Sequence, residues 1–104
     1  MTYKLDFYDQ ALKEWKKLDR SIRLQFKQKL EERLKSPRVP ESKLRDSKDR
    51  YKIKLRGVGY RLVYEVHDQI ITIVVVAVGR RDKNELYSKS TERFLTDLIK
   101  NQSN

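Results

Sequence analysis

The stretch YKIKLRGVGYRLVYEV, from Tyr51 to Val66, alternates between apolar and polar residues on both sides of a turn at Gly57–Gly59. Alternation with a period of two is typical of a strand with one buried face. Two such runs separated by a glycine-containing turn predict an antiparallel hairpin. The face that should be solvated carries four cations: Lys52, Lys54, Arg56 and Arg61. The stretch therefore predicts a sheet and a concentration of positive charge on one of its faces.

The register of this hairpin follows from matching its apolar residues, because cross-strand apolar pairs on one face stabilise a sheet. The expected pairs are Tyr51 with Val66, Lys52 with Glu65, Ile53 with Tyr64, Lys54 with Val63, Leu55 with Leu62, and Arg56 with Arg61. In this register the basic side chains share one face across two strands. Glu65 is expected to oppose Lys52 and to favour its charged form.

Length and composition describe a single small basic domain spanning residues 1–104. The chain has 25 Lys and Arg against 15 Asp and Glu, a formal net charge of +10, which points to a polyanionic partner such as nucleic acid. Eight Lys or Arg and two Asp fall between Lys43 and Arg61, so +6 of this charge lies in one segment. Cysteine is absent, which excludes disulfides and thiolate metal sites. No segment resembles a signal peptide or a membrane span, so a cytoplasmic protein is expected.

The rest of the chain predicts an α/β (α+β) domain in the order β-α-α-β-β-β-α. Its small, mostly antiparallel four-stranded sheet is expected to carry two N-terminal helices on one face. The elements are a strand at Tyr3–Phe7, a helix capped by Asp9 with a stripe of Leu12, Trp15 and Leu18, a second helix with Ile22, Phe26, Leu30 and Leu34 that Pro37 ends, a loop to Arg50, the hairpin, a buried strand at Gln69–Gly79, a helical turn at Asp82–Glu85, and a last helix at about 91–100 before a frayed tail at 101–104. The basic residues of the two N-terminal helices, Lys29 and Arg33 among them, are interpreted as ordinary solvated surface.

Clustered lysines on a strand have chemical consequences. Residues i and i+2 lie about 6.5–7 Å apart, and two unit charges at that distance repel by roughly 2.4 kcal/mol at an effective dielectric of about 20. This repulsion is expected to lower the pKa of Lys52 or Lys54, which would suit either lysine to act as a general base. Since Glu65 is expected to oppose Lys52, Lys54 is predicted to be the more perturbed of the two.

Other side chains suit phosphate and an unpaired base. Arginine binds phosphate oxygens with two parallel hydrogen bonds, so Arg61 and Arg81 are candidates to stabilise charge during in-line attack. Tyr87 offers a ring for stacking on a base. RNA fits this set because its 2′-OH is an internal nucleophile, so no cofactor is expected. The single histidine, His67, adjoins Asp68 in a predicted turn, where a turn role is expected and metal ligation is not.

Three segments together resemble the RelE family of bacterial toxins, and most closely its enteric members. They are DFYDQALKEWKKLD, YKIKLRGVGYRLVYEV and VVVAVGRRDKNELY. The resemblance implies a ribosome-dependent messenger RNA endonuclease that a RelB-like antitoxin neutralises. It also implies a mobile C-terminal helix, and the lysine/arginine type of active site instead of a Glu/His pair.

The resemblance further implies a role for each site residue. The catalytic positions would be Lys52, Lys54, Arg61, Arg81 and Tyr87. A lysine at 52 or 54 would be the base, Arg61 would stabilise the phosphate, Arg81 would assist the leaving 5′-oxygen, and Tyr87 would orient the nucleotide. Arg45 would contact ribosomal RNA. The further RNA-binding candidates are Lys43, Arg56 and Arg80.

Two other functions are compatible with the sequence. One is the gyrase-poisoning ParE-like branch of the same superfamily, which shares the fold but lacks this catalytic set. The other is an RNA-binding module whose basic face never reacts. The hairpin cations also have a purely structural interpretation, since charge on an edge strand guards against aggregation. Tyr87 has one too, in packing of the C-terminal turn.

Overall fold

The computed structural model describes residues 2–45 and 49–80. Its elements are β1 (Lys4–Phe7), α1 (Asp9–Lys16), α2 (Arg20–Lys35), a 3-10 turn at Pro40–Ser42, β2 (Arg50–Leu55), β3 (Tyr60–His67), a second 3-10 turn at Asp68–Ile70, and β4 (Thr72–Arg80). The predicted turn at Asp82–Glu85 and the predicted last helix lie outside the described residues. No helix in the described ranges is both long and apolar enough to span a membrane.

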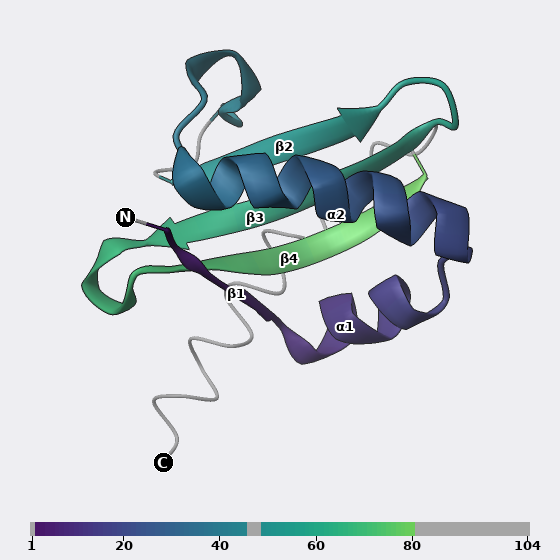
Figure 1. Ribbon diagram of the computed structural model, residues 1–104, viewed down its shortest axis with the longest axis horizontal. Coiled ribbons are helices and arrows are strands. Elements are labelled where there is room, and N and C mark those ends of the chain that lie inside the picture. The colour runs from purple at the N-terminus through teal and green to yellow at the C-terminus, as the bar shows by residue number, and fades with distance from the viewer. Residues whose placement is uncertain (1, 46–48, 81–104) are drawn as a thin grey trace.

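The four strands form one sheet in the order β1-β4-β3-β2 (Figure 1). The β2–β3 and β3–β4 pairs are antiparallel, and β1 runs parallel to β4. The predicted mostly antiparallel four-stranded sheet is therefore confirmed. β2 lies at an edge, so one side of its backbone faces away from the sheet.

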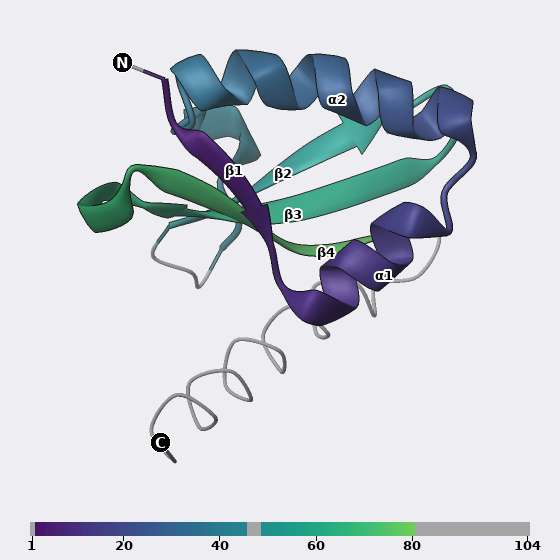
Figure 2. The same cartoon turned by 60° about the horizontal axis from the view of Figure 1, so that its bottom comes forward.

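The main core lies between the helices and one face of the sheet. Figure 2 shows α2 running over that face, with α1 beside β1 and β4. The predicted α2 stripe is confirmed, since Ile22, Phe26 and Leu30 are all buried. They pack against alternate residues of the strands, namely Tyr51, Ile53, Leu62, Tyr64, Ile73 and Val75. Both predicted N-terminal helices thus bury an apolar face on the sheet, as expected.

A smaller apolar cluster occupies the other face of the sheet. It consists of Val63, Val76 and Ala77, with Tyr8 and Leu44 packed against it. The β3–β4 register shifts between Val63 and Tyr64, which pair with Ala77 and Val75 and leave Val76 as an extra residue. Residues of both parities are buried in β4, and the bulge adds one residue to this strand. The uniformly apolar sequence of β4 therefore could not specify its register.

Three predicted boundaries are wrong by a few residues. The N-cap of α1 is Tyr8, and Asp9 is the first helical residue, where its carboxylate lies near the positive end of the helix. Leu18 lies beyond the end of α1. The last strand begins at Thr72 instead of Gln69, because Asp68–Ile70 form a 3-10 turn and Ile71 adopts a left-handed φ of 48°.

The predicted hairpin register is wrong by two residues. The observed pairs are Arg50 with Glu65, Tyr51 with Tyr64, Lys52 with Val63, Ile53 with Leu62, Lys54 with Arg61, and Leu55 with Tyr60. The four-residue turn lies one residue earlier than expected, at 56–59 instead of 57–60, where Gly59 N–H donates to Leu55 O at 2.9 Å and Gly59 has a φ of 71°. Arg56 consequently lies in the turn and has no cross-strand partner. A shift of two preserves the faces, so the predicted apolar and basic faces are both correct.

Candidate active site

The polar face of the hairpin consists of three cross-strand rows. The first pairs Arg50 with Glu65, the second Lys52 with Val63, and the third Lys54 with Arg61. The side chains of these rows point away from α2 because the alternate residues of β2 and β3 are buried beneath it. One face therefore changes from a paired acid and base at one end to two facing cations at the other.

Several polar side chains converge on the carboxylate of Glu65 in the first row. Its carboxylate accepts hydrogen bonds from Arg50 Nε at 2.9 Å, Arg50 Nη2 at 2.6 Å and the Tyr8 hydroxyl at 2.6 Å. His67 Nε2 also lies 2.9 Å from Glu65 Oε1. Glu65 and Arg50 are buried, so the ion pair is shielded from water. The expected Lys52–Glu65 pairing is wrong, and His67, at the end of β3, contacts Glu65 instead of serving only in a turn.

The third row places like charges opposite one another. Nearby Lys52 is the main cause of a lowered pKa at Lys54, followed by partial desolvation and the charges of Arg61 and Arg56. The prediction that Lys54 would be perturbed downward is confirmed. Among the described residues, neither lysine has a carboxylate partner. A lysine in such surroundings is neutral more often than an ordinary one, and so is better able to accept a proton.

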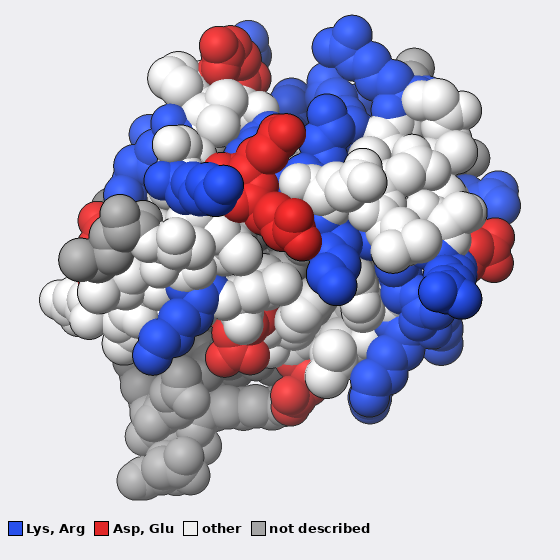
Figure 3. Space-filling model, viewed as in Figure 1, with Lys and Arg blue, Asp and Glu red and all other residues white. Residues whose placement is uncertain are grey.

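Figure 3 shows how charge is distributed on the face that α2 covers. Blue Lys and Arg side chains are spread widely over this face, with red carboxylates near its middle. Blue side chains also gather along the upper edge, where Figure 1 places β2 and the β2–β3 turn. The positive charge therefore reaches the edge of the sheet next to the third row.

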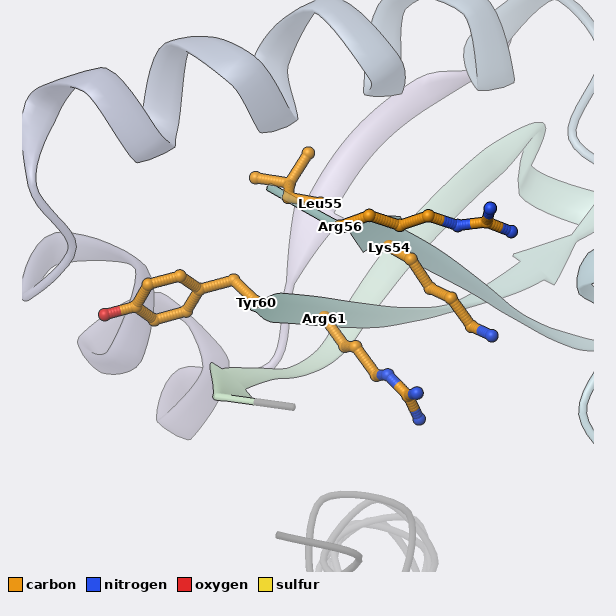
Figure 4. A pocket seen from close by; sticks show the side chains of 5 residues that line it. All are labelled: Lys54, Leu55, Arg56, Tyr60 and Arg61. Carbon is orange, nitrogen blue, oxygen red and sulfur yellow. The ribbon is translucent and has the colours of Figure 1, made fainter. Parts of the chain in front are cut away.

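A hollow of about 310 Å³ opens beside the third row. It is lined by Lys54, Leu55, Arg56, Tyr60 and Arg61. Figure 4 shows the Lys54 and Arg61 side chains leaving neighbouring strands on the same side, while Leu55 points toward α2. The hollow thus brings a candidate base and a candidate phosphate ligand together, with an aromatic ring at its margin. Tyr60 was not identified from the sequence.

The other predicted RNA-binding residues lie around this hollow or on the preceding segment. The Arg80 guanidinium lies 5.9 Å from the centre of the Tyr60 ring, which places the exit of β4 next to the hollow. Lys43 and Arg45 are exposed on the segment before β2, which Lys43 joins to Tyr51 through an isolated bridge. The predicted site residues Arg81 and Tyr87 lie outside the described residues.

A surface ion-pair network holds both ends of the segment that connects α2 to β2. Arg38 donates to Asp49 at 3.0 and 3.2 Å and to Asp68 at 3.0 and 2.9 Å, and the Tyr3 hydroxyl donates to Asp68 at 2.7 Å. Hydrogen bonds from Arg38 and Tyr3 keep the pKa of Asp68 below its usual value. The network joins the start of the segment to its end and to the β3–β4 turn. This role of Arg38 was not predicted from the sequence.

Arg33 shows that the helix cations are not all ordinary solvated surface. Its guanidinium donates to the Tyr64 hydroxyl at 2.9 Å, to Lys52 O at 3.3 Å and to Ser42 Oγ at 3.2 Å. The Tyr64 hydroxyl in turn donates to Pro37 O at 2.6 Å. Arg33 therefore fastens α2 to the outer edge of β2 at Lys52. The sequence contained a signal for this face, since Gln25, Lys29 and Arg33 recur every four residues.

The described residues contain no group of three or more His, Cys, Asp or Glu side chains that could hold a metal ion. Their chemistry is that of cations and hydroxyls, which bind phosphate and transfer protons. Within the hollow, Lys54 and Arg61 together are suited to a phosphodiester whose neighbouring hydroxyl loses a proton.

Comparison with known proteins places this arrangement among toxins. A family model described as the ParE toxin of the type II toxin–antitoxin system parDE matches residues 5–85. The chain is 52% identical over 95 residues to the mRNA interferase toxin RelE of Escherichia coli strain K12, covering 91% of this chain and 100% of that protein. A putative RelE-like toxin protein of Escherichia coli is 50% identical over 94 residues, covering 90% of this chain and 99% of that protein.

Solved structures agree with the sequence comparison. A double-arginine mutant of the E. coli toxin RelE in its free state matches with a TM-score of 0.83 at 50% identity, covering 89% of this chain and 98% of that one. The toxin of the intact E. coli RelBE toxin–antitoxin complex matches with a TM-score of 0.73 at 54% identity, covering 75% of this chain and 95% of that one.

Proposed function

Because the chain belongs to the RelE/ParE family of toxins, we propose that it is the toxin of a type II toxin–antitoxin system and cleaves messenger RNA. The observation that supports this proposal most directly is the third row of the hairpin, where Lys54 faces Arg61 beside a hollow. The similarity to an mRNA interferase over the full length of that relative supports the same substrate here. A RelB-like antitoxin is the corresponding partner, since a matched solved structure is a RelBE complex. Its place of action is the cytoplasm, where messenger RNA is translated.

The proposed reaction is attack of a ribose 2′-OH on the adjacent phosphorus. The 2′-oxygen forms a bond to phosphorus as the bond from phosphorus to the 5′-oxygen breaks. Lys54, or else Lys52, accepts the 2′-OH proton, and the leaving 5′-oxygen takes a proton from water. Arg61 stabilises the negative charge on the phosphoryl oxygens, because its fixed fork of donors matches their geometry. Arg81 and Tyr87, outside the described residues, are proposed to assist the leaving oxygen and to orient the nucleotide.

Proton transfer is expected to contribute only part of the rate. Bound phosphate is an anion, which moves the pKa of a nearby lysine back upward. Arginine has a pKa above about 12, so it is a reluctant acid. Most of the acceleration must therefore come from alignment of the 2′-OH with phosphorus and from preorganised charge. A message held in the decoding site of a ribosome is aligned more often than a free strand, which accounts for ribosome dependence.

The test uses one oligoribonucleotide in three forms. On a programmed ribosome it should be cut quickly, to products ending in a 2′,3′-cyclic phosphate and a 5′-hydroxyl. Free in solution it should be cut negligibly, and a 2′-deoxy version at the scissile nucleotide should resist cleavage on the ribosome. Efficient cutting of the free strand or of the deoxy substrate contradicts this mechanism.

Gyrase poisoning is the second candidate, and the description of the matched family model as a ParE toxin is the observation that favours it. The two functions separate in a pair of assays. A gyrase poison converts supercoiled DNA into cleaved complexes in the presence of gyrase and leaves programmed ribosomes intact. An mRNA endonuclease does the reverse, which is the outcome expected here. A protein that binds ribosomes and does neither would be the non-catalytic RNA-binding module.

A further inference from the structure

A second groove lies on the other side of the exposed edge of β2. Its volume is about 540 Å³, and it runs between α2 and β2. Its lining includes Lys54, Leu55 and Arg56, which also line the hollow of the candidate active site. The two cavities therefore meet along the end of β2 and can accept one continuous ligand.

The charge of this groove is strongly positive. Five of its lining residues are cationic, and one, Glu41, is acidic. Lys29 and Arg33 come from α2, whereas the other three cations come from the hairpin. Arg33 is held in place by Tyr64, Ser42 and the Lys52 carbonyl, so its charge is preorganised. A surface that assembles five cations from two elements is stabilised when an anion occupies it.

The backbone of the edge strand adds a hydrogen-bond donor to this groove. Lys52 O accepts from Arg33, and Arg50 O accepts from the Leu44 amide at 2.9 Å, so both carbonyls point away from β3. In an antiparallel ladder the N–H and C=O of one residue point to the same side. The amide of Lys54 therefore faces the groove, whereas that of Lys52 lies beside the segment that Lys43 bridges to β2. Amide donors among cations are the groups that bind phosphate oxygens.

We propose that the α2–β2 groove is a second phosphate site, which binds the RNA backbone adjacent to the scissile phosphate. The inference rests on the proposed function, because both cavities would hold RNA. A peptide strand added to the β2 edge is disfavoured by the lining, in which Leu55 is the sole apolar residue. Strand addition derives its specificity from pockets for alternate side chains, and this groove offers cations instead.

Two groove variants and one matched control test the proposal. Lys29→Gln removes a groove cation, and Glu41→Gln removes the groove carboxylate. Lys27→Gln is the control, since Lys27 is an exposed lysine of the same helix that does not line the groove. Binding is measured by fluorescence anisotropy against salt, on ribosomes programmed with a message that carries a 2′-deoxy scissile nucleotide. A second set of ribosomes carries a message that ends before the decoding site.

Lys29→Gln should weaken binding several-fold and reduce the slope of log affinity against log salt by roughly 0.7, the value for one lost contact to a single strand. Glu41→Gln should tighten binding, and Lys27→Gln should change neither quantity appreciably. If the Lys29 effect disappears with the shortened message, the phosphate belongs to messenger RNA, as proposed; if it persists, the phosphate belongs to ribosomal RNA and the proposed place beside the scissile phosphate is wrong.

Equal effects of Lys29→Gln and Lys27→Gln would overturn the proposal, because they would report general surface charge. So would a loss of affinity for purified antitoxin in Lys29→Gln with RNA binding unchanged, since the groove would then be a protein site. Failure of the proposed function has a different signature. In that case the wild-type protein would not cut a normal message, whereas the opposite shifts of Lys29→Gln and Glu41→Gln in binding would remain.

Discussion

The two ends of the β2–β3 hairpin carry cations in opposite surroundings. At the Arg50 end, each cation meets an acid: Arg50 is buried against Glu65, and nearby Arg38 bridges Asp49 and Asp68. At the Lys54 end, two cations face one another, and Lys52 adds a third. The two ends lie on one face and two rows apart. Composition therefore does not separate structural from functional charge, whereas the presence of a carboxylate does.

The difference predicts which property each end controls. A buried ion pair that loses one partner leaves a desolvated charge, so the Arg50 end should control stability. Clustered cations repel one another in the free protein and are stabilised by a bound polyanion, so the Lys54 end should control binding and rate. Substitutions at the two ends test whether stability and catalysis are divided in this way.

The largest expected effect is on cleavage by Lys54→Ala. Loss of a general base costs roughly 10²–10⁴-fold in rate. Lys54 is partly exposed on the polar face and has no carboxylate partner among the described residues, so the melting temperature should hardly change. The measurement is single-turnover cleavage on saturated ribosomes, paired with thermal unfolding. Lys13→Ala, at an exposed position on α1, is the control. An unchanged rate in Lys54→Ala would remove the assignment of Lys54 as the base.

The next effect is on stability, by Glu65→Gln. Breaking a buried pair costs about 3–5 kcal/mol, because Arg50 then keeps a buried charge without its carboxylate. The measurement is urea unfolding of Glu65→Gln and of the double variant Arg50→Met/Glu65→Gln. The double variant should recover most of the loss, since it buries no unpaired charge. A double variant as unstable as the single one would show that the Tyr8 and His67 contacts with Glu65, and not the ion pair, stabilise this end.

The sequence predicted which residues share each face of this hairpin, but not which residues pair across its strands. Alternation specifies which residues share a face, and it is unchanged when one strand slides by two residues. The actual register goes with the position of the turn, at 56–59, where Gly59 adopts a left-handed conformation. Hence Lys54 was correctly predicted to be the perturbed lysine, although the expected reason, Glu65 opposite Lys52, was wrong. The observed causes are the charge of nearby Lys52, partial desolvation and the charges of Arg61 and Arg56.

Long-range polar contacts could not be predicted from the sequence either. The guanidinium of Arg38 joins Asp49 to Asp68, and Arg33 reaches a backbone carbonyl of a strand. No local pattern encodes such distances, because they depend on how the helices pack on the sheet. The apolar stripe of α2 and the order of the elements were predictable, because burial and periodicity are local properties of the chain. Arg81 and Tyr87 remain predictions.

The smallest expected effect is on the pH–rate profile, and it distinguishes the roles of Lys52 and Lys54. The charge of Lys52 is the main cause of the lowered pKa of Lys54, so Lys52→Gln should let that pKa rise toward the ordinary value of about 10.4. The neutral amine then becomes abundant only at higher pH, and the rising limb of the pH–rate profile should move upward. Screening by solvent and salt limits the size of the shift, so the variant should be slower than the wild type at a fixed pH below the limb and should approach it at higher pH.

Lys52→Arg is the matched control, because it keeps the positive charge and removes the titrating amine. If Lys54 is the base and Lys52 acts through its charge, the arginine variant should keep the wild-type profile. If Lys52 is itself the base, Lys52→Gln and Lys52→Arg should both lose activity at every pH. The two variants therefore distinguish a lysine that takes the proton from one that only lowers the pKa of its neighbour. Coincident, unshifted profiles for wild type and Lys52→Gln would exclude both roles.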